Sequence, residues 1–310
     1  MRSLKTYYSI LRKKGFYTSM RELKKAVWPI WWTHNKAVIE QIQSDRVSRY
    51  LWRHYKSQII QPINEAELSI KPTRIIWLCW LQGLDNAPEI VKRCVASVKQ
   101  YMPKYEIRIL TNDNIYDYVS LPDHIVKKYE KGVIKFAHFS DILRTALLVQ
   151  YGGIWIDSTV LFTGTIPSHI LDLPLFFLQQ SKMQVTPHMG SSWLLVAQKG
   201  NPILSRVLEL LYTYWERENK LRDYYLYHIF FYLVLTYNAQ GENAWRAIPY
   251  YSNVDSHTLR AYLFDDFEEE QWQILIKRSP IHKLSWKFIP SDPLDKKGTY
   301  YDYILHHLHL

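Results

Sequence analysis

Cysteine and long apolar runs are both scarce in this sequence. Cys79 and Cys94 are the only cysteines among 310 residues, and their spacing fits neither a disulfide framework nor a metal site, so we expect a reducing, cytoplasmic environment. The longest apolar run, residues 224–237, is shorter than the roughly 20 residues that span a bilayer, and it predicts a buried helix. No apolar core follows the first charges, so we expect no signal peptide.

Acidic residues are scarce at the start of the chain. Residues 1–60 hold 13 Lys or Arg and three acidic residues, so they account for the whole net charge of +10. Helices with basic faces, broken near Pro29, are expected here. Two interpretations stay open: an anionic membrane binds this segment, or the basic faces are simply solvated. A third, nucleic-acid binding, lacks any recognisable module, so we expect no nucleic-acid partner.

The body of the chain alternates strand and helix patterns. An apolar strand at residues 74–80, a helix beginning at Pro88 and a strand at 105–110 form a βαβ unit. Further strands are expected at 154–157, 159–162, 174–179 and 192–197, and further helices at 122–131, 137–151, 202–217, 223–238 and 267–277. The pattern predicts an α/β fold with a mixed, mainly parallel sheet and flanking helices.

This organisation predicts three regions. A basic helical extension occupies residues 1–60, an α/β domain occupies residues 73–290, and a C-terminal tail occupies residues 291–310. We expect no metal site at His306, His307 and His309 in the tail, because we expect no acidic residue or cysteine close enough to complete one.

The most informative segment is residues 139–161. Asp141 and Arg144 share one face of a predicted helix, Gly152 and Gly153 allow a tight turn, and a short apolar strand then ends at Asp157. A surface ion pair would explain Asp141 and Arg144 taken alone. A carboxylate at the end of an apolar strand is costly without a partner, however, so we expect the three side chains to meet at a ligand site. Such a site suits a ligand with a sugar and a phosphate.

The run AHFSDILRTALLVQYGGIWIDSTV, residues 137–160, resembles the donor-site signature of glycosyltransferase family 32, in particular its capsular-polysaccharide-synthesis branch. Residues 75–94 and 279–286 also resemble parts of this family, and the resemblance covers residues 74–290. It implies a GT-A fold, a nucleotide-sugar donor and sugar transfer with retention at the anomeric carbon.

The resemblance also implies roles for individual residues. Trp80 would stack on the nucleotide base, with Gln82 beside it, and Asp141 and Arg144 would hold the sugar hydroxyls. Asp157 would lie between ribose, sugar and a Mn²⁺ or Mg²⁺ ion. The second acidic residue of the family's Asp-x-Asp motif falls on Thr159, which is a weaker metal ligand.

The C-terminal loop and the acceptor side add further candidates. His282 is a candidate metal ligand and Lys283 a candidate partner of the diphosphate, although both could belong to an ordinary polar loop. Trp286 would close over the donor or lie in the core. Asp223 would face the acceptor or begin the helix at 223–238 as its N-cap.

We therefore expect a retaining hexosyltransferase that uses a nucleotide sugar, with a UDP-sugar favoured, and a lipid-linked oligosaccharide acceptor. The basic segment would hold it on the inner face of the plasma membrane during synthesis of capsule or another surface polysaccharide. One alternative is an inactive scaffold of a polysaccharide assembly complex, in which Thr159 marks a lost metal site. The other is a basic nucleic-acid-binding protein.

Overall fold

The computed structural model describes residues 36–63, 73–181 and 186–310. The chain divides into two compact units, Met1–His54 and Tyr55–Leu310. Helix α3 (Lys36–Ile60) accounts for the part of the predicted basic extension that is described, and the predicted break at Pro29 lies outside the described residues. Among the described helices, none combines the length and the apolar character needed to cross a bilayer.

The predicted βαβ unit is present in the second unit. Strand β1 (Ile75–Cys79) leads to helix α4 (Glu89–Tyr101) and then to β2 (Glu106–Leu110), which pairs with β1 in parallel. Pro88 precedes α4, where its missing N–H costs nothing. The apolar side chains of α4 recur at helical spacing and are buried: Ile90, Val91, Cys94, Val95 and Val98.

The central sheet has five strands in the order β2-β1-β3-β6-β5. Strand β3 (Gly153–Ile156) is parallel to β1, while β6 (Gly190–Ala197) is antiparallel to both β3 and β5 (Leu175–Gln179). Four strands therefore run in one direction and β6 runs in the other, which confirms the predicted mixed, mainly parallel sheet. A separate two-stranded sheet joins β4 (Val160–Phe162) to β7 (Ile281–Lys283).

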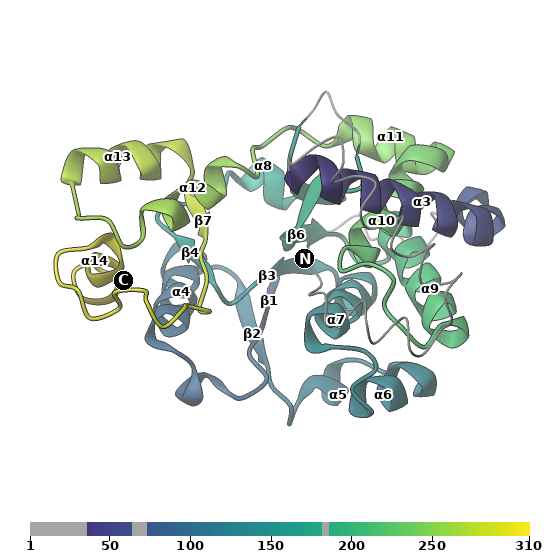
Figure 1. Cartoon of the computed structure of the whole chain (residues 1–310), viewed down its shortest axis with the longest axis horizontal. Helices are drawn as coiled ribbons and strands as arrows, with labels where there is room; N and C mark the ends of the chain where they lie inside the picture. Colours follow the sequence, from purple (N-terminus) through teal and green to yellow (C-terminus); the bar gives the residue numbers. More distant parts are fainter. Residues whose placement is uncertain (1–35, 64–72, 182–185) are drawn as a thin grey trace, which may run out of the picture. The chain divides into compact units, whose positions relative to one another are not determined.

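Helices cover this sheet on two sides, as predicted, with α4 on one side and α7 and α9 on the other (Figure 1). Helix α7 (Phe136–Tyr151) packs on β3 and β6, and α9 (Pro202–Arg217) packs on α7 and on α10 (Leu226–Tyr237). The remaining described helices are α5 (Ile115–Tyr118), α6 (Asp123–Glu130), α8 (Ser168–Leu171), α11 (Ala239–Ala247), α12 (Asp255–Tyr262), α13 (Glu269–Arg278) and α14 (Tyr300–His306), with a 3₁₀ turn at Leu84–Asn86.

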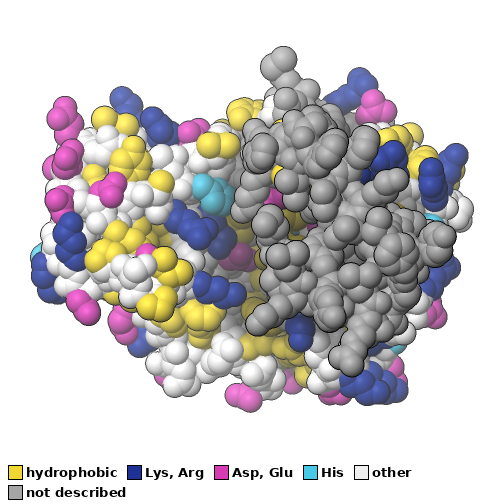
Figure 2. All heavy atoms as spheres, in the orientation of Figure 1, with side chains coloured by type: hydrophobic (Ala, Val, Ile, Leu, Met, Phe, Trp, Pro, Cys, Tyr) yellow, Lys and Arg dark blue, Asp and Glu magenta, His cyan; other side chains and the backbone are white. Residues whose placement is uncertain are grey.

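The segment predicted as a C-terminal tail differs in the structure. Tyr300 and Ile304 on α14 are fully buried in one apolar cluster with side chains of α4, α12 and α13. Arg93 on α4 donates a hydrogen bond to the carbonyl of Ile304 over 2.9 Å. Figure 2 shows hydrophobic side chains bordered by Lys and Arg over the region of α4 and α14. Residues 300–306 are therefore part of the packed body.

Candidate active site

Two glycines shape the turn between α7 and β3. Gly152 and Gly153 have φ angles of 72° and 102°, which side-chain-bearing residues rarely adopt. A Cβ on Gly153 would lie 2.4 Å from the carbonyl oxygen of Ile75, so the close pairing of β3 with β1 also requires glycine there. This turn places the carboxyl end of β3, and hence Asp157, beside the carboxyl end of β1. Ser158 spans the two ends by donating a hydrogen bond to the carbonyl of Cys79 over 3.1 Å.

Asp141, Arg144 and Asp157 converge in the structure. The Nη2 atom of Arg144 lies 3.4 Å from Asp141 Oδ1 and 3.7 Å from Asp157 Oδ1. Arg144 is also fixed from behind, because Nη1 donates to the carbonyl of Ser192 over 2.6 Å and Nε donates to the carbonyl of Ser140 over 3.3 Å. The guanidinium therefore joins the carboxylate of its own helix to the carboxylate at the end of β3.

Because Asp141 and Arg144 are buried, the charge of each one affects the pKa of the other. Burial by itself raises the pKa of Asp141, but the Arg144 guanidinium and His138 outweigh it, so the pKa of Asp141 is lowered. Burial likewise opposes the charge of Arg144, and the carboxylates of Asp141 and Asp157 keep the pKa of Arg144 raised. Asp141 and Arg144 are therefore held in the charged state. The exposed fraction of the Asp157 side chain, 28%, leaves this carboxylate open to a ligand.

Lys283 reaches the other oxygen of Asp157. Its Nζ atom lies 3.6 Å from Asp157 Oδ2 and donates a hydrogen bond to Thr159 Oγ1 over 2.6 Å. Strand pairing explains this contact, because Val160 on β4 is the partner of Lys283 on β7. The ammonium group thus lies between the side chains at positions 157 and 159.

His282 is not brought to this place, which corrects the predicted metal set of Asp157, Thr159 and His282. Adjacent residues of a strand point to opposite sides, so His282 points away from the site that Lys283 faces. It is buried, its Nε2 lies 3.0 Å from the hydroxyl of Thr163, and burial lowers its pKa to about 4. In the described part of the chain, no group of three or more His, Cys, Asp or Glu residues could hold a metal ion.

The donor set at Asp157 does not fit a divalent cation either. Each carboxylate oxygen already faces a cationic side chain, Arg144 on one side and Lys283 on the other. The hydroxyl of Thr159 is engaged by the same ammonium group. A hard divalent ion prefers several oxygen ligands of negative charge, and a positive neighbour on each side of a single carboxylate opposes that preference.

The predicted base-binding residues lie at the end of β1. The rings of Trp80 and Trp286 meet edge to face with their centroids 5.3 Å apart, and the Trp286 side chain is 42% exposed. The indole nitrogen of Trp80 is buried and has no hydrogen-bond partner among the described residues. Gln82 lies in the turn after β1 and is exposed. The two tryptophans therefore offer a half-exposed aromatic surface at the carboxyl end of β1.

Helix α10 contributes a residue that the sequence analysis did not select. Burial lowers the pKa of His228 to about 4, and the charges of Asp141 and Arg144 act on the ring. His228 is thus a neutral imidazole at neutral pH that faces the same charged cluster. A second histidine that the sequence did not point to is His138, one turn before Asp141 on α7, whose Nδ1 lies 3.5 Å from Asp141 Oδ2. A single histidine in an apolar run gives no sequence signal that separates it from a core residue.

Asp223, the predicted acceptor residue, has a local role. Its Oδ1 accepts a hydrogen bond from the backbone N–H of Tyr225 over 2.8 Å, just before α10 begins. This arrangement stabilises the turn into the helix and is close to the alternative N-cap interpretation, although the capping position itself is Tyr225.

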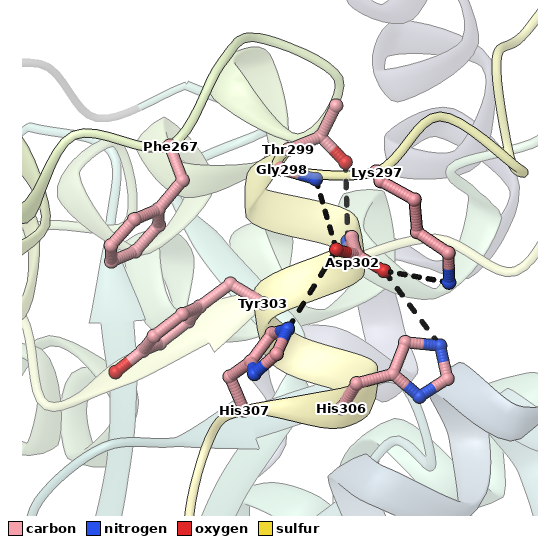
Figure 3. Close-up of a pocket in the computed structure, with 8 residues that line it drawn as sticks. All are labelled: Phe267, Lys297, Gly298, Thr299, Asp302, Tyr303, His306 and His307. Atoms are coloured by element: carbon pink, nitrogen blue, oxygen red, sulfur yellow. Dashed lines mark hydrogen bonds and ion pairs between the residues drawn. The ribbon is translucent and has the colours of Figure 1, made fainter.

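A pocket of about 550 Å³ lies at the C-terminal helix, apart from the residues above (Figure 3). Asp302 on α14 lies at its centre, and His306 and His307 each have Nε2 3.8 Å from one of its oxygens. Asp302 therefore lies close to these histidines, which corrects the prediction that no acidic residue is near them. The other Asp302 contacts come from Lys297 at 3.2 Å and the N–H of Gly298 at 2.9 Å, so its carboxylate is fully engaged.

This chain is similar to two curated proteins that are named as glycosyltransferases. It is 25% identical over 175 residues to the glycosyltransferase afumC of Aspergillus fumigatus (strain CBS 144.89 / FGSC A1163 / CEA10), covering 51% of this chain and 44% of that protein. It is 24% identical over 169 residues to the O-glycosyltransferase braB of Annulohypoxylon truncatum, covering 48% of this chain and 39% of that protein. The matches thus span less than half of the length of each curated relative.

Among solved structures, the PaToxG glycosyltransferase is similar with a TM-score of 0.40 and 15% identity, covering 67% of this chain and 84% of that one. Residues 6–304 match the capsular polysaccharide synthesis protein family. That match takes in both the Asp141–Asp157 segment and β7, which together build the charged cluster. The chain therefore belongs to the capsular polysaccharide synthesis protein family.

Proposed function

We propose that the chain is a retaining glycosyltransferase with a GT-A type fold, of glycosyltransferase family 32, that moves a hexose from a nucleotide sugar to an acceptor hydroxyl. The observation that carries this proposal is the convergence of two carboxylates and two cations, Asp141, Arg144, Asp157 and Lys283, at the carboxyl ends of β1 and β3. Ligands of α/β sheets bind at this end of the strands. Membership of the capsular polysaccharide synthesis family and the glycosyltransferase names of the curated relatives support it.

The reaction breaks the bond between the anomeric carbon and the phosphate oxygen, and the electron pair stays on that oxygen. Arg144 and Lys283 would stabilise the negative charge that develops there. The acceptor oxygen forms the new bond from the side that the leaving group vacates, and its proton passes to the departing phosphate. No side chain has to act as the general base in this scheme.

The other residues would bind and orient the donor. Trp80 and Trp286 would hold the base through their half-exposed rings, with Gln82 at the rim. Asp141 would accept hydrogen bonds from sugar hydroxyls, and Asp157 would bind ribose or sugar hydroxyls with its exposed edge. His228, a neutral ring beside Asp141, would bind a hydroxyl of the sugar or of the acceptor, a role that the sequence analysis had given to Asp223.

We propose a UDP-sugar as donor and a lipid-linked oligosaccharide of a capsule or surface polysaccharide as acceptor. The basic residues of the first 60 positions would attach the protein to the inner face of the plasma membrane, since each basic residue near an anionic surface contributes about 1 kcal/mol. In the full chain, changing Arg12, Lys13 and Lys14 to Ser should weaken co-sedimentation with vesicles containing phosphatidylglycerol. Unchanged binding would contradict this attachment.

A direct test measures nucleotide release from UDP-, GDP- and CMP-sugars. Asp157→Asn keeps the shape of the side chain but removes its charge, and turnover should fall by about a hundredfold or more. Asp172→Asn makes the same chemical change at an exposed position and should leave turnover intact. Normal turnover of Asp157→Asn, with its fold checked by thermal unfolding, would contradict the proposal.

The inactive-scaffold alternative rested on Thr159 as the mark of a lost metal site. The Lys283 ammonium at Thr159 favours a working site, because it supplies positive charge at that place. No nucleotide release from any donor, together with no binding of any nucleotide, would favour the scaffold instead.

A further inference from the structure

Thr159 and Asp157 hold one ammonium group between them. Lys283 Nζ lies 2.6 Å from Thr159 Oγ1 and 3.6 Å from Asp157 Oδ2, and the exposed fraction of its side chain is 19%. Asp157 and Thr159 belong to the segment between β3 and β4. Lys283 lies on β7, which pairs with β4. A fixed cation of the protein thus lies where the family resemblance implies a metal ion.

A second cation completes the arrangement. Arg144 Nη2 lies 3.7 Å from Asp157 Oδ1, and the carbonyl of Ser192 and the carbonyl of Ser140 hold the guanidinium in place. Asp157 therefore has a positive group at each oxygen. A carboxylate between two fixed cations attracts a divalent ion weakly, because their repulsion offsets much of its own attraction.

Thr159 also changes what the site can bind. Its hydroxyl oxygen accepts the hydrogen bond from Lys283, so the hydroxyl hydrogen remains for an acceptor. A phosphate oxygen is such an acceptor, whereas a metal ion is not. An aspartate at position 159 would be an acceptor only and would raise the affinity for a divalent ion. Together, the ammonium and the hydroxyl suit a phosphate oxygen directly.

We propose that this protein binds the diphosphate of its donor and cleaves the sugar–phosphate bond without a divalent metal ion, with Lys283 and Arg144 as the cations that a metal would otherwise provide. The inference rests on the proposed function and specifies its chemistry. The bond that breaks and the fate of the acceptor proton are those given above. Charge on the leaving oxygen is met by two groups that the fold holds in position before the donor arrives.

The test measures nucleotide affinity by isothermal titration calorimetry, which does not depend on turnover. UDP, GDP, CDP and inorganic pyrophosphate are titrated separately into the full chain in the presence of EDTA, and again with Mn²⁺. At least one nucleotide should bind in EDTA with an affinity similar to that in Mn²⁺. Titration of Mn²⁺ alone should give no binding heat.

Two variants of Lys283 identify the group responsible. Lys283→Met removes the charge and keeps the length, so nucleotide binding in EDTA should weaken by about tenfold to a hundredfold. Lys283→Arg keeps the charge and should retain most of the affinity. Lys277→Met changes the net charge equally at an exposed position of α13 and should bind as the unchanged protein does. Thermal unfolding of each variant checks its fold.

The outcomes separate the two proposals. Nucleotide binding that requires Mn²⁺ and disappears in EDTA would overturn metal independence and leave the glycosyltransferase proposal standing. Full affinity of Lys283→Met in EDTA would also overturn it. Failure of every probe to bind, with or without Mn²⁺, would overturn the proposed function and this inference with it.

Discussion

The indole nitrogen of Trp155 donates a hydrogen bond to Asp157 Oδ1 over 2.9 Å. Trp155 is buried in β3, and its ring also lies under the Arg144 guanidinium, whose carbon is 5.2 Å from the ring centroid. One buried side chain therefore orients both the carboxylate and the cation of the candidate active site. Strand β3 holds Trp155 in position, and Trp155 in turn positions Asp157 and Arg144.

Trp155→Phe should slow nucleotide release with little loss of folding. The smaller ring fills most of the space but cannot donate to Asp157, and a hydrogen bond to a charged group contributes about 1.5–3 kcal/mol, so release should fall by roughly tenfold to a hundredfold. Trp272→Phe, the same change in the buried cluster of α13, should leave the rate unaltered. Equal effects of the two variants on the rate would remove Trp155 from the site.

His282 should make stability depend on pH. Its pKa is lowered to about 4 by burial, against about 6.5 in an unfolded chain. Between pH 6.5 and pH 4 the His282 side chain is protonated in the unfolded state but stays neutral in the folded state. Its contribution to the free energy of unfolding is therefore fully present above pH 6.5 and decreases as the pH falls from 6.5 to 4. The loss at this residue approaches roughly 3 kcal/mol by pH 4.

The measurement compares thermal unfolding at pH 7 and pH 4.5. His282→Gln cannot be protonated in this range, so its unfolding temperature should drop less between the two pH values than that of the unchanged protein. His309→Gln, at an exposed position, should behave like the unchanged protein. An identical pH dependence for His282→Gln would show that the ring is not buried in its neutral form.

The convergence of Asp141, Arg144 and Asp157 was predictable because each step is local. The helical spacing of Asp141 and Arg144 places them on one face, and the glycine pair with a short apolar strand places Asp157 at a sheet edge. Parallel neighbours then bring Trp80 to the same edge. These inferences need only periodicity and the rules of parallel sheets.

The errors arose where distant segments meet. The contact of Lys283 with Thr159 depends on the register of β4 and β7, which are more than a hundred positions apart, and a shift of one residue would have put His282 there instead. The role of His228 depends on how α10 packs on α9 and α7. The burial of Tyr300 and Ile304 depends on contacts with α4, and their own helix has only 7 residues, which is too short to show a clear helical periodicity in the sequence.

Gly153→Ala should be severe because two costs add. Its φ of 102° is unfavourable for alanine, and the new Cβ would lie 2.4 Å from the carbonyl oxygen of Ile75. We expect unfolding to become easier by roughly 3 kcal/mol or more, with loss of nucleotide binding as β3 moves away from β1. Denaturant unfolding followed by tryptophan fluorescence measures this change.

Gly132 provides a control, because it has a positive φ angle like Gly153 but no close contact at the position of a Cβ atom. Gly132 has a φ of 68°, and a Cβ there would meet only the end of the Lys135 side chain at 3.8 Å. Gly132→Ala should therefore cost only about 1–2 kcal/mol and leave nucleotide binding intact. A mild effect of Gly153→Ala, equal to that of Gly132→Ala, would mean that β1 and β3 do not approach as closely as the pairing requires.

Thr299 is the N-cap of α14, and its loss should weaken the C-terminal helix. The Thr299 side chain is fully buried, and its Oγ1 accepts a hydrogen bond from the N–H of Asp302 over 3.1 Å, as Figure 3 shows. Its hydroxyl donates to the carbonyl of Lys296 over 3.2 Å. Thr299→Ala removes both bonds, so the free energy of unfolding should fall by about 1 kcal/mol. Thr299→Ser keeps both bonds and should recover most of that loss.

Because α14 packs on α4 rather than on the charged cluster, nucleotide affinity should not change in either variant. A fall in affinity would mean that the C-terminal helix acts on the candidate active site through α4, and equal stabilities of the Ala and Ser variants would mean that Thr299 does not cap the helix.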